Sequence, residues 1–314
     1  MRVALVYGGF SSEREASGEN AVYIEKALRQ KGYDTCMIPY EKNLVRTLRR
    51  EQIDIVYVCV QGKGHGDGTI QAVLEQEGIP FTGSGFHAAA LINDKILSKM
   101  VFDRAGIPTP RWKVLTKDEY EDGLFAAEHF GFPFVAKAPS EGGSFGIELV
   151  RSEKELNRLS DVFAYESPIL IEEFIRGDFY TIGVLEQDGE LTTLPCVQGI
   201  EIEKGQRKCD PDSLLLFTGD YITGDAKLPE ELLVKMEGMA RKVFCITGAR
   251  GVARIDFMVG KDDQKPYVLE INAVPGLKPR SLLPGEAERA GIVYEDLIEG
   301  ILLEAWNQVK KEER

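Results

Sequence analysis

Two segments near the end of the chain decide the fold: Gly251-Val252-Ala253-Arg254-Ile255-Asp256-Phe257 and Tyr267-Val268-Leu269-Glu270-Ile271-Asn272-Ala273. Apolar and polar residues alternate in both, as they do in strands, whose side chains point to opposite faces with period two. Arg254 and Asp256 therefore share one face of the first strand, and Glu270 and Asn272 share one face of the second. If the strands pair, these four side chains meet on one patch. The alternative is a hairpin with one solvated face, on which they have no chemical task.

Such a patch has the donors of a magnesium site. Two carboxylates and an amide oxygen suit Mg²⁺, which proteins hold with few side chains while substrate phosphates complete the octahedron. Arg254 beside them can stabilise charge on a transferring phosphoryl group or a tetrahedral oxyanion. The sharp turn Val274-Pro275-Gly276 that follows favours this interpretation over the solvated hairpin.

A second segment, from Phe134 to Gly146, reads FVAKAPSEGGSFG, an apolar strand that ends in Lys137 and continues into a loop of small residues. Backbone N–H groups in such a loop can approach phosphate oxygens closely, with the lysine as a compact positive charge. The motif G-x-x-x-x-G-K-[ST] occurs nowhere in the chain, so the loop is not a Walker P-loop. A flexible hairpin loop without a ligand is the alternative.

Two further segments carry weaker signals. Residues 170–175, LIEEFI, mix apolar and acidic side chains at a strand end, which suits an adenine pocket with carboxylates for ribose hydroxyls, or an ordinary edge strand. Ser12 and Glu15 have the spacing of a capping box, which predicts a helix that begins here and runs to about Leu28. Glu13 at this helix N-terminus can receive a substrate ammonium group, or the segment is a cap and nothing more.

The order of expected elements divides the chain. Alternating strands and helices over the first ninety residues predict a parallel sheet of the Rossmann type. A second α/β unit covers residues 111–198, and the polar, glycine-containing stretch 199–228 is a long loop of the kind that is usually functional. A helix near 229–246, two strands, an irregular loop to Pro284 and a last helix near 294–310 complete the chain. We expect domains at residues 1–93, 94–180 and 181–314.

Composition excludes several function classes. The net charge of −13 on 314 residues disfavours nucleic-acid binding, which needs cationic side chains against phosphates. The chain has no apolar run near the roughly 20 residues that span a bilayer, and its start is too short for a signal peptide, so we expect a cytoplasmic protein without membrane partners. Five scattered cysteines without a C-x-x-C pair argue against a zinc site or a disulfide framework.

Taken in order, these segments resemble the D-alanine–D-alanine ligases of the ATP-grasp superfamily across nearly the whole chain. The matching pieces are Gly-Gly-x-Ser-x-Glu-Arg-Glu at 8–15, Asp67 to Gln71, Phe81 to Gly85, Asp94-Lys95, Lys137 with its loop, the 170–175 segment, Arg254 to Asp256, Leu269 to Asn272, Pro275-Gly276 and Ser281-Leu282. The resemblance implies an α/β (α+β) ATP-grasp fold behind a small parallel N-terminal domain.

The resemblance also implies roles. ATP is expected to contact Lys95, Lys137, Gly142, Gly143, Ser144, Glu172, Glu173, Phe174 and Ile175. Asp256, Glu270 and Asn272 are expected to hold two Mg²⁺ ions, for which Mn²⁺ can substitute. Glu13 is expected to bind the first amino acid, Arg254 and the Gly276 backbone to stabilise the tetrahedral intermediate, and Ser281 and Leu282 to meet the second substrate. Residues 199–228 are the expected lid, and a homodimer is implied.

Several departures from the family lie on the substrate side. The histidine of its His-Gly motif is Gln61 here, the acid of its Gly-Glu-Asp-Gly motif is Gly66, and a serine that bonds to the first glutamate is Gly143. Met-Thr-x-His before the terminal serine becomes Leu277-Lys278-Pro279-Arg280. The lid lacks the family's lysine–tyrosine pair, for which Lys204, Lys208 and Tyr221 are candidates.

Three functions follow from these residues. The first is D-alanyl-D-alanine synthesis for peptidoglycan: ATP and two D-alanines give the dipeptide, ADP and phosphate through an acyl phosphate. The second is a related ligase of specialised metabolism that joins another carboxylate and amine, with Lys278 and Arg280 recruiting a more acidic acceptor. The third is a nucleotide-binding regulator without catalysis, which the intact metal-site residues disfavour.

Overall fold

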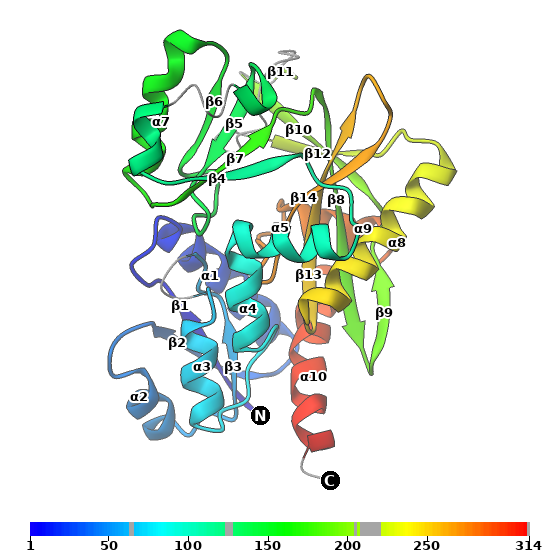
Figure 1. Cartoon of the computed structure of the whole chain (residues 1–314). Helices are drawn as coiled ribbons and strands as arrows, with labels where there is room; N and C mark the ends of the chain where they lie inside the picture. Colours follow the sequence, from blue (N-terminus) through cyan, green and yellow to red (C-terminus); the bar gives the residue numbers. More distant parts are fainter. Residues whose placement is uncertain (63–65, 123–127, 204–205, 208–220, 313–314) are drawn as a thin grey trace.

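Three β-sheets organise the protein, which is described here from a computed structural model covering residues 1–62, 66–122, 128–203, 206–207 and 221–312. The N-terminal unit and the C-terminal helix α10 (Tyr294–Glu312) lie together at the bottom of the view in Figure 1, and a four-stranded sheet stands above them. The third and largest sheet lies beside both in this view.

The N-terminal sheet is parallel, with strand order β2-β1-β3. Its strands are β1 (Arg2–Tyr7), β2 (Asp34–Pro39) and β3 (Ile55–Val58), and its helices are α1 (Arg14–Gln30), α2 (Leu44–Arg50), α3 (Thr69–Gln76) and α4 (Phe86–Asn93). The middle of β1 is fully buried because helices cover both faces of the sheet. The predicted parallel sheet is confirmed.

The second sheet is antiparallel, with order β4-β7-β5-β6. It contains β4 (Trp112–Leu115), β5 (Phe134–Lys137), β6 (Ile147–Val150) and β7 (Ile169–Glu173), with the 3₁₀ helices η1 (Asp118–Asp122) and η2 (Glu153–Arg158) and the short helix α7 (Leu159–Phe163). A small core of its own, centred on Phe134 and Ile171, joins the sheet to α7. Helix α5 (Lys95–Arg104) leads into this unit from the first.

The largest sheet follows the path β11-β10-β8-β13-β14, with β12 beside β10 and β9 beside β8. Its strands are β8 (Gly177–Gln187), β9 (Glu190–Thr193), β10 (Val197–Glu203), β11 (Gln206–Arg207), β12 (Tyr221–Asp225), β13 (Val252–Gly260) and β14 (Pro266–Asn272). The expected domain boundary at 180/181 falls inside β8, and the division into three domains stays a prediction. Helix α8 (Glu230–Thr247) was predicted at 229–246.

Alternation along β13 separates a core face from a chemical face. Ala253, Ile255 and Phe257 pack against α8 and the helices α4 and α5 in one continuous core. The intervening residues Arg254 and Asp256 therefore point to the opposite face of the sheet. Helix α9 (Leu282–Arg289) packs on that other side, in a second core shared with α1 and α10.

Three local predictions were wrong or incomplete. The Ser12 side chain does not cap α1, whose N-cap is Glu13 with no side-chain cap bond; the Ser12 hydroxyl instead donates to Glu141 Oε2 at 2.7 Å. Helix α9 replaces part of the expected irregular loop, because Pro284 is tolerated in the first turn of a helix. Helix α4 was not predicted at all. Among the described residues, no helix is both long and apolar enough to cross a membrane.

Candidate active site

A cavity of about 330 Å³ opens where the three units meet. One end is lined by the second sheet, the middle by the β13–β14 hairpin, and the other end by α1 and the 273–282 segment. The residues of the expected site that line it are Glu13, Lys95, Lys137, Gly142, Gly143, Ser144, Glu172, Glu173, Phe174, Ile175, Arg254, Asp256, Glu270, Asn272, Gly276 and Leu282. Among all the expected site residues, only Ser281 does not line the cavity.

The β13–β14 hairpin brings its four polar residues together. In its register Arg254 lies opposite Asn272, and Asp256 lies opposite Glu270. Arg254 donates twice to Asp256, from Nε to Oδ1 at 2.8 Å and from Nη2 to Oδ2 at 2.7 Å, while Asn272 Nδ2 donates to Oδ2 at 3.0 Å. The four side chains therefore form one patch in the cavity wall, as the strand pattern predicts.

Asp256 is held from a third strand as well. The Thr181 hydroxyl of β8 lies 2.8 Å from Asp256 Oδ1, and β8 pairs with β13 so that these two residues are directly opposite. Only 3% of Asp256 is exposed, and its carboxylate is surrounded by donors. The acidic residue next to Arg254 also raises the pKa of the guanidinium, although burial opposes this. Asp256 is thus fixed in place before any ligand binds.

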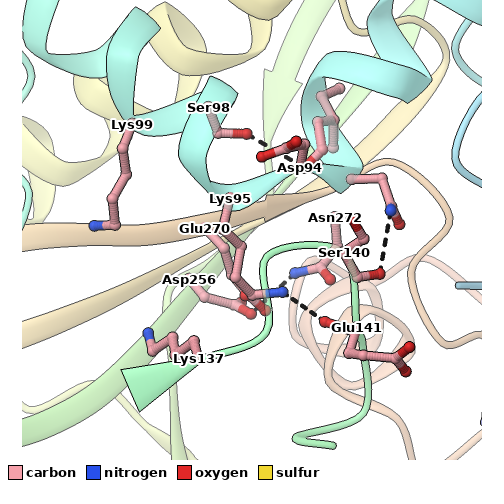
Figure 2. Close-up of polar contacts among 12 residues, drawn as sticks. Asp94, Lys95, Ser98, Lys99, Lys137, Ser140, Glu141, Asp256, Glu270 and Asn272 are labelled. Atoms are coloured by element: carbon pink, nitrogen blue, oxygen red, sulfur yellow. Dashed lines mark hydrogen bonds and ion pairs between the residues drawn. The ribbon is translucent and has the colours of Figure 1, made fainter. Parts of the chain in front are cut away.

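Glu270 faces two lysines from other elements. Lys95 Nζ is 3.5 Å from Glu270 Oε2 and also donates to the Glu141 carbonyl oxygen at 2.6 Å. Figure 2 shows Lys95 reaching from α5 to this group, with Lys137 below it at the end of β5. Burial raises the pKa of Glu270, but Lys95, Lys137 and Arg254 outweigh it and hold the pKa below its ordinary value. Glu270 is therefore a carboxylate at neutral pH.

A buried charge cluster supports this wall from behind. Glu172 forms ion pairs with both Lys99 and Lys137, and the Glu172 and Lys99 side chains are almost fully buried. Burial raises the pKa of Glu172, but the two lysines lower it to about 2. Burial in turn lowers the pKa of Lys99, and Glu172 opposes that shift. Glu172 lines the expected nucleotide end, but its carboxylate is engaged with the lysines.

Sequence reasoning missed Lys99, although a signal was present. Lys95 and Lys99 are four residues apart on α5, so they project from the same side of the helix toward the hairpin (Figure 2). The Lys99 ammonium also donates to the Thr109 hydroxyl, which in turn donates to the Val268 carbonyl of β14 at 2.7 Å. Lys99 thereby connects the helix, the second sheet and the hairpin.

The end of the cavity next to β7 is mainly apolar. Phe174 and Ile175 line it together with Val135, Ile147, Phe179, Met258 and Leu269. Glu173 lies at the rim, where Arg111 Nε donates to its carboxylate at 2.6 Å. An apolar lining whose acids are already paired suits an aromatic group such as a nucleobase, and we call this part of the cavity the apolar slot.

The glycine-rich loop closes over Glu13. A Cβ at Gly142 would lie 2.2 Å from Glu13 Oε2, so any larger residue there would displace the Glu13 carboxylate. Gly143 and Ser144 follow with left-handed φ angles of 57° and 66°, which turn the backbone back toward β6. Burial in this wall raises the pKa of Glu13 to about 7, even though Lys95 lowers it. A cationic ligand at Glu13 would restore its charge.

The opposite end is formed by the turn between β14 and α9. Gly276, Lys278 and Leu282 line the cavity here. Ser281 sits just behind the wall, and a Cβ at Gly276 would lie 3.2 Å from its Oγ. Gln61 Nε2 donates to the Val274 carbonyl at 2.7 Å, and the Leu277 N–H donates to Asn20 Oδ1 at 2.9 Å. Side chains of the N-terminal unit thus hold the turn in place.

Glu286 of α9 is an acid that the sequence patterns did not reveal. It is fully buried beneath the Arg254–Asp256 pair, against Thr181 and Gly183. A Cβ at Gly183 would lie 2.5 Å from Glu286 Oε2, so the glycine makes room for this side chain. Burial raises the pKa of Glu286 well above its ordinary value, and Arg254 only partly opposes this.

Part of the expected lid lies outside the described residues. Lys204 and Lys208 belong to that part, and for Tyr221 only the backbone, in β12, is described. The described remainder of 199–228 is strand: β10 and β12 pair antiparallel from Val197–Asp225 to Glu201–Tyr221.

Comparisons with known proteins agree with this geometry. Residues 101–303 match the family model described as D-ala D-ala ligase C-terminus. The chain is 37% identical to a D-alanine–D-alanine ligase of Carboxydothermus hydrogenoformans over 96% of this chain and 97% of that protein. It is 35% identical to that of Geobacter sulfurreducens over 99% and 96%. The solved structure of the Bacillus anthracis ligase complexed with ATP superposes with a TM-score of 0.82 at 30% identity, covering 99% of both chains.

Proposed function

Because this chain belongs to the D-alanine–D-alanine ligase family, we propose that it uses ATP to join two D-alanine molecules. The γ-phosphoryl group passes to a carboxylate oxygen of the first D-alanine, giving an acyl phosphate and ADP. The neutral amine of the second D-alanine then attacks the acyl carbon. The C–O bond to phosphate breaks, the amine loses a proton, and D-alanyl-D-alanine and inorganic phosphate are released.

One observation supports this proposal above the others: the hairpin patch, the two lysines Lys95 and Lys137 and the apolar residues beside β7 all line one cavity. The apolar residues Phe174, Ile175, Met258 and Leu269 bind the base. Lys95 and Lys137, which line the same cavity, bind the phosphates. Glu172, which is itself paired with Lys99, holds the Lys137 ammonium in place.

Asp256, Glu270 and Asn272 fit a pair of Mg²⁺ ions. Their donor set is two carboxylates and an amide, and the described residues contain no group of three or more histidine, cysteine, aspartate or glutamate side chains that could cage a metal alone. Such a half-shell suits Mg²⁺, whose remaining positions go to phosphate oxygens and water. When bound, the ions neutralise the charge of the transferring phosphoryl group. Asp256 meanwhile keeps Arg254 oriented in the wall.

On the substrate side, Glu13 binds the ammonium of the first D-alanine, which directs its carboxylate toward the phosphates. Arg254 uses Nε and Nη2 for Asp256, so its Nη1 donors and the Gly276 N–H stabilise the tetrahedral oxyanion. Ser281 and Leu282 contact the second substrate. The glycine-rich loop, tied to α1 through Ser12 and Glu141, limits access of water to the acyl phosphate.

The family resemblance also supports a proposal about the protein's cellular location, its oligomeric state and the use of its product. We propose that the protein is a cytoplasmic homodimer that supplies the dipeptide for peptidoglycan precursors. A second candidate function, ligation of a different acceptor, is favoured by one observation: the cavity wall carries Lys278 at its acceptor end.

The test is ADP release measured against a panel of D- and L-amino acids, alone and in pairs, with mass detection of the product. D-alanine alone is expected to support turnover and to give the D,D-dipeptide. Arg254→Met is expected to lower kcat by about 10²–10³-fold, the cost of one oxyanion donor. The exposed Arg46→Met serves as the matched control. Nucleotide binding without ADP release from any pair would contradict the proposal.

A further inference from the structure

The acceptor end of the cavity carries Lys278, whose side chain is more exposed than those of the other cavity lysines. Lys278 lines the cavity beside Gly276 and Leu282, and 40% of its side chain is exposed. The side chains of Lys95 and Lys137 are each only 10% exposed. Lys278 is therefore a cation that a diffusing substrate can reach directly.

The present partner of Lys278 is also unlike theirs. Its Nζ lies 2.8 Å from Glu19 Oε2, and the Glu19 side chain on α1 is 61% exposed and does not line the cavity. Lys137, in contrast, pairs with Glu172, which is almost fully buried. Exposed ion pairs contribute little to stability because water competes for both charges. Lys278 can thus exchange Glu19 for an anionic ligand with little loss.

The backbone under Lys278 is fixed, so its side chain starts from a defined place. The Lys278 carbonyl accepts from the Ser281 N–H at 2.7 Å, which closes the turn into α9. The neighbouring Leu277 is held at both ends: its N–H donates to Asn20, and its carbonyl accepts from the Tyr294 hydroxyl at 2.7 Å. A lysine on a fixed turn at the mouth of a cavity is suited to selecting a charged ligand.

We propose that Lys278 binds a carboxylate of the acceptor amine and so selects anionic acceptors. This rests on the proposed function, because there is an acceptor amine to bind only if the protein joins it to a donor. Lys278 lines the same cavity as Gly276, which lies two residues earlier on the same turn and whose N–H is proposed to bind the oxyanion. The partly exposed Lys278 ammonium in this wall is a counter-charge for the anionic group of the acceptor. The carboxylate can be the α-carboxylate of an amino acid or a side-chain carboxylate.

The experiment compares acceptors with and without the charge. Dipeptide formation is measured with D-alanine as donor and D-alanine, D-alaninamide or D-glutamate as acceptor, using Lys278→Met and the control Lys265→Met. Lys265 belongs to an exposed pair with Asp263 in the β13–β14 turn, outside the cavity. Lys278→Met is expected to raise the KM of carboxylate acceptors about tenfold, the factor for one charged contact, with kcat and the KM for ATP unchanged.

The pattern across acceptors identifies the carboxylate. A change for D-alanine but not for D-alaninamide assigns the α-carboxylate to Lys278. A change for D-glutamate alone assigns the side-chain carboxylate. An equal effect on D-alaninamide and on both carboxylate acceptors, or no effect on any, overturns the inference. Wild-type turnover with D-alanine in the same assay tests the proposed function separately, so the two failures are distinguishable.

Glu19→Gln provides a second variant that leaves the cavity wall intact. Because it removes the competing anion, the KM of the carboxylate acceptor is expected to fall about twofold. A KM that is unchanged or higher contradicts the exchange of Glu19 for substrate.

Discussion

The two ends of the cavity are built in different ways. At the nucleotide end the charges are buried and closed on one another: Glu172 lies between Lys99 and Lys137, and Asp256 accepts hydrogen bonds from Arg254 and Asn272. At the acceptor end the wall is a turn, and its one described cation, Lys278, pairs with an exposed acid. Paired strands and a buried cluster fix the nucleotide end. At the acceptor end, replacing a few turn residues is enough to alter which ligand binds.

This difference explains where the chain departs from its family. A buried ion pair that loses one partner leaves an uncompensated charge, so substitutions at the nucleotide end carry a large cost. An exposed lysine on a turn can be replaced with little effect on the fold. Of the departures from the family pattern, Gln61 and the 277–280 segment belong to the region of the β14–α9 turn. Burial thus constrains the residues at the nucleotide end, whereas the exposed turn residues that contact the acceptor can vary.

The largest expected effect is on the buried cluster. Glu172→Gln removes the shared anion between Lys99 and Lys137 and is expected to lower the free energy of unfolding by about 3–5 kcal/mol. Denaturant titration followed by circular dichroism measures this change. Glu173→Gln next to it, in an exposed pair with Arg111, is the matched control and is expected to cost at most about 1 kcal/mol. If both variants lost the same free energy of unfolding, the claim that the buried ion pairs matter more than the exposed pair would be wrong.

A smaller effect is expected on the pH dependence of kcat/KM for the first substrate, which Glu13 is proposed to bind. Its pKa of about 7 means that the free site loses its negative charge as the pH falls below that value. Since the ammonium of the first substrate needs a carboxylate, its kcat/KM should fall about tenfold per pH unit below pH 7 and level off above it. Glu13→Gln is expected to abolish this dependence. A flat profile for the wild-type protein would contradict the assignment of Glu13.

The same group links activity to stability. Its pKa in the folded state lies above the ordinary value of 4.5, so the folded state binds the proton more tightly than the unfolded state. The contribution of Glu13 to the free energy of unfolding is therefore fully present below about pH 4.5 and is lost as the pH rises to about 7. Glu13 at neutral pH lowers stability in exchange for a charged binding group.

The hairpin patch could be predicted from the sequence because it depends on strand periodicity. The alternation in 251–257 and 267–273 was enough to bring Arg254, Asp256, Glu270 and Asn272 to one face. The pairing of Lys99 with Glu172 could not be predicted in this way, since it joins a helix to a strand of another sheet. Helical spacing from Lys95 was the available signal.

Other features depend on tertiary contacts that local patterns do not contain. Ser12 has the spacing of a cap, but Glu141, 129 residues away, takes its hydroxyl. Glu286 lies in a stretch that reads as loop because of Pro284, although helix α9 buries it under Arg254. The sequence named Lys278 as a candidate contact of the acceptor, but its ion pair with Glu19 arises only from the packing of α1 against the turn.

The most direct test of the account is the magnesium dependence of nucleotide binding. Titration calorimetry with a non-hydrolysable ATP analogue, with and without Mg²⁺, is to be carried out on the wild-type protein and on Glu270→Gln. The account predicts that Mg²⁺ tightens binding to the wild-type protein and that Glu270→Gln loses most of this gain while it still binds the nucleotide in the apolar slot. The same magnesium effect in both proteins would contradict the claim that the hairpin patch holds the metal.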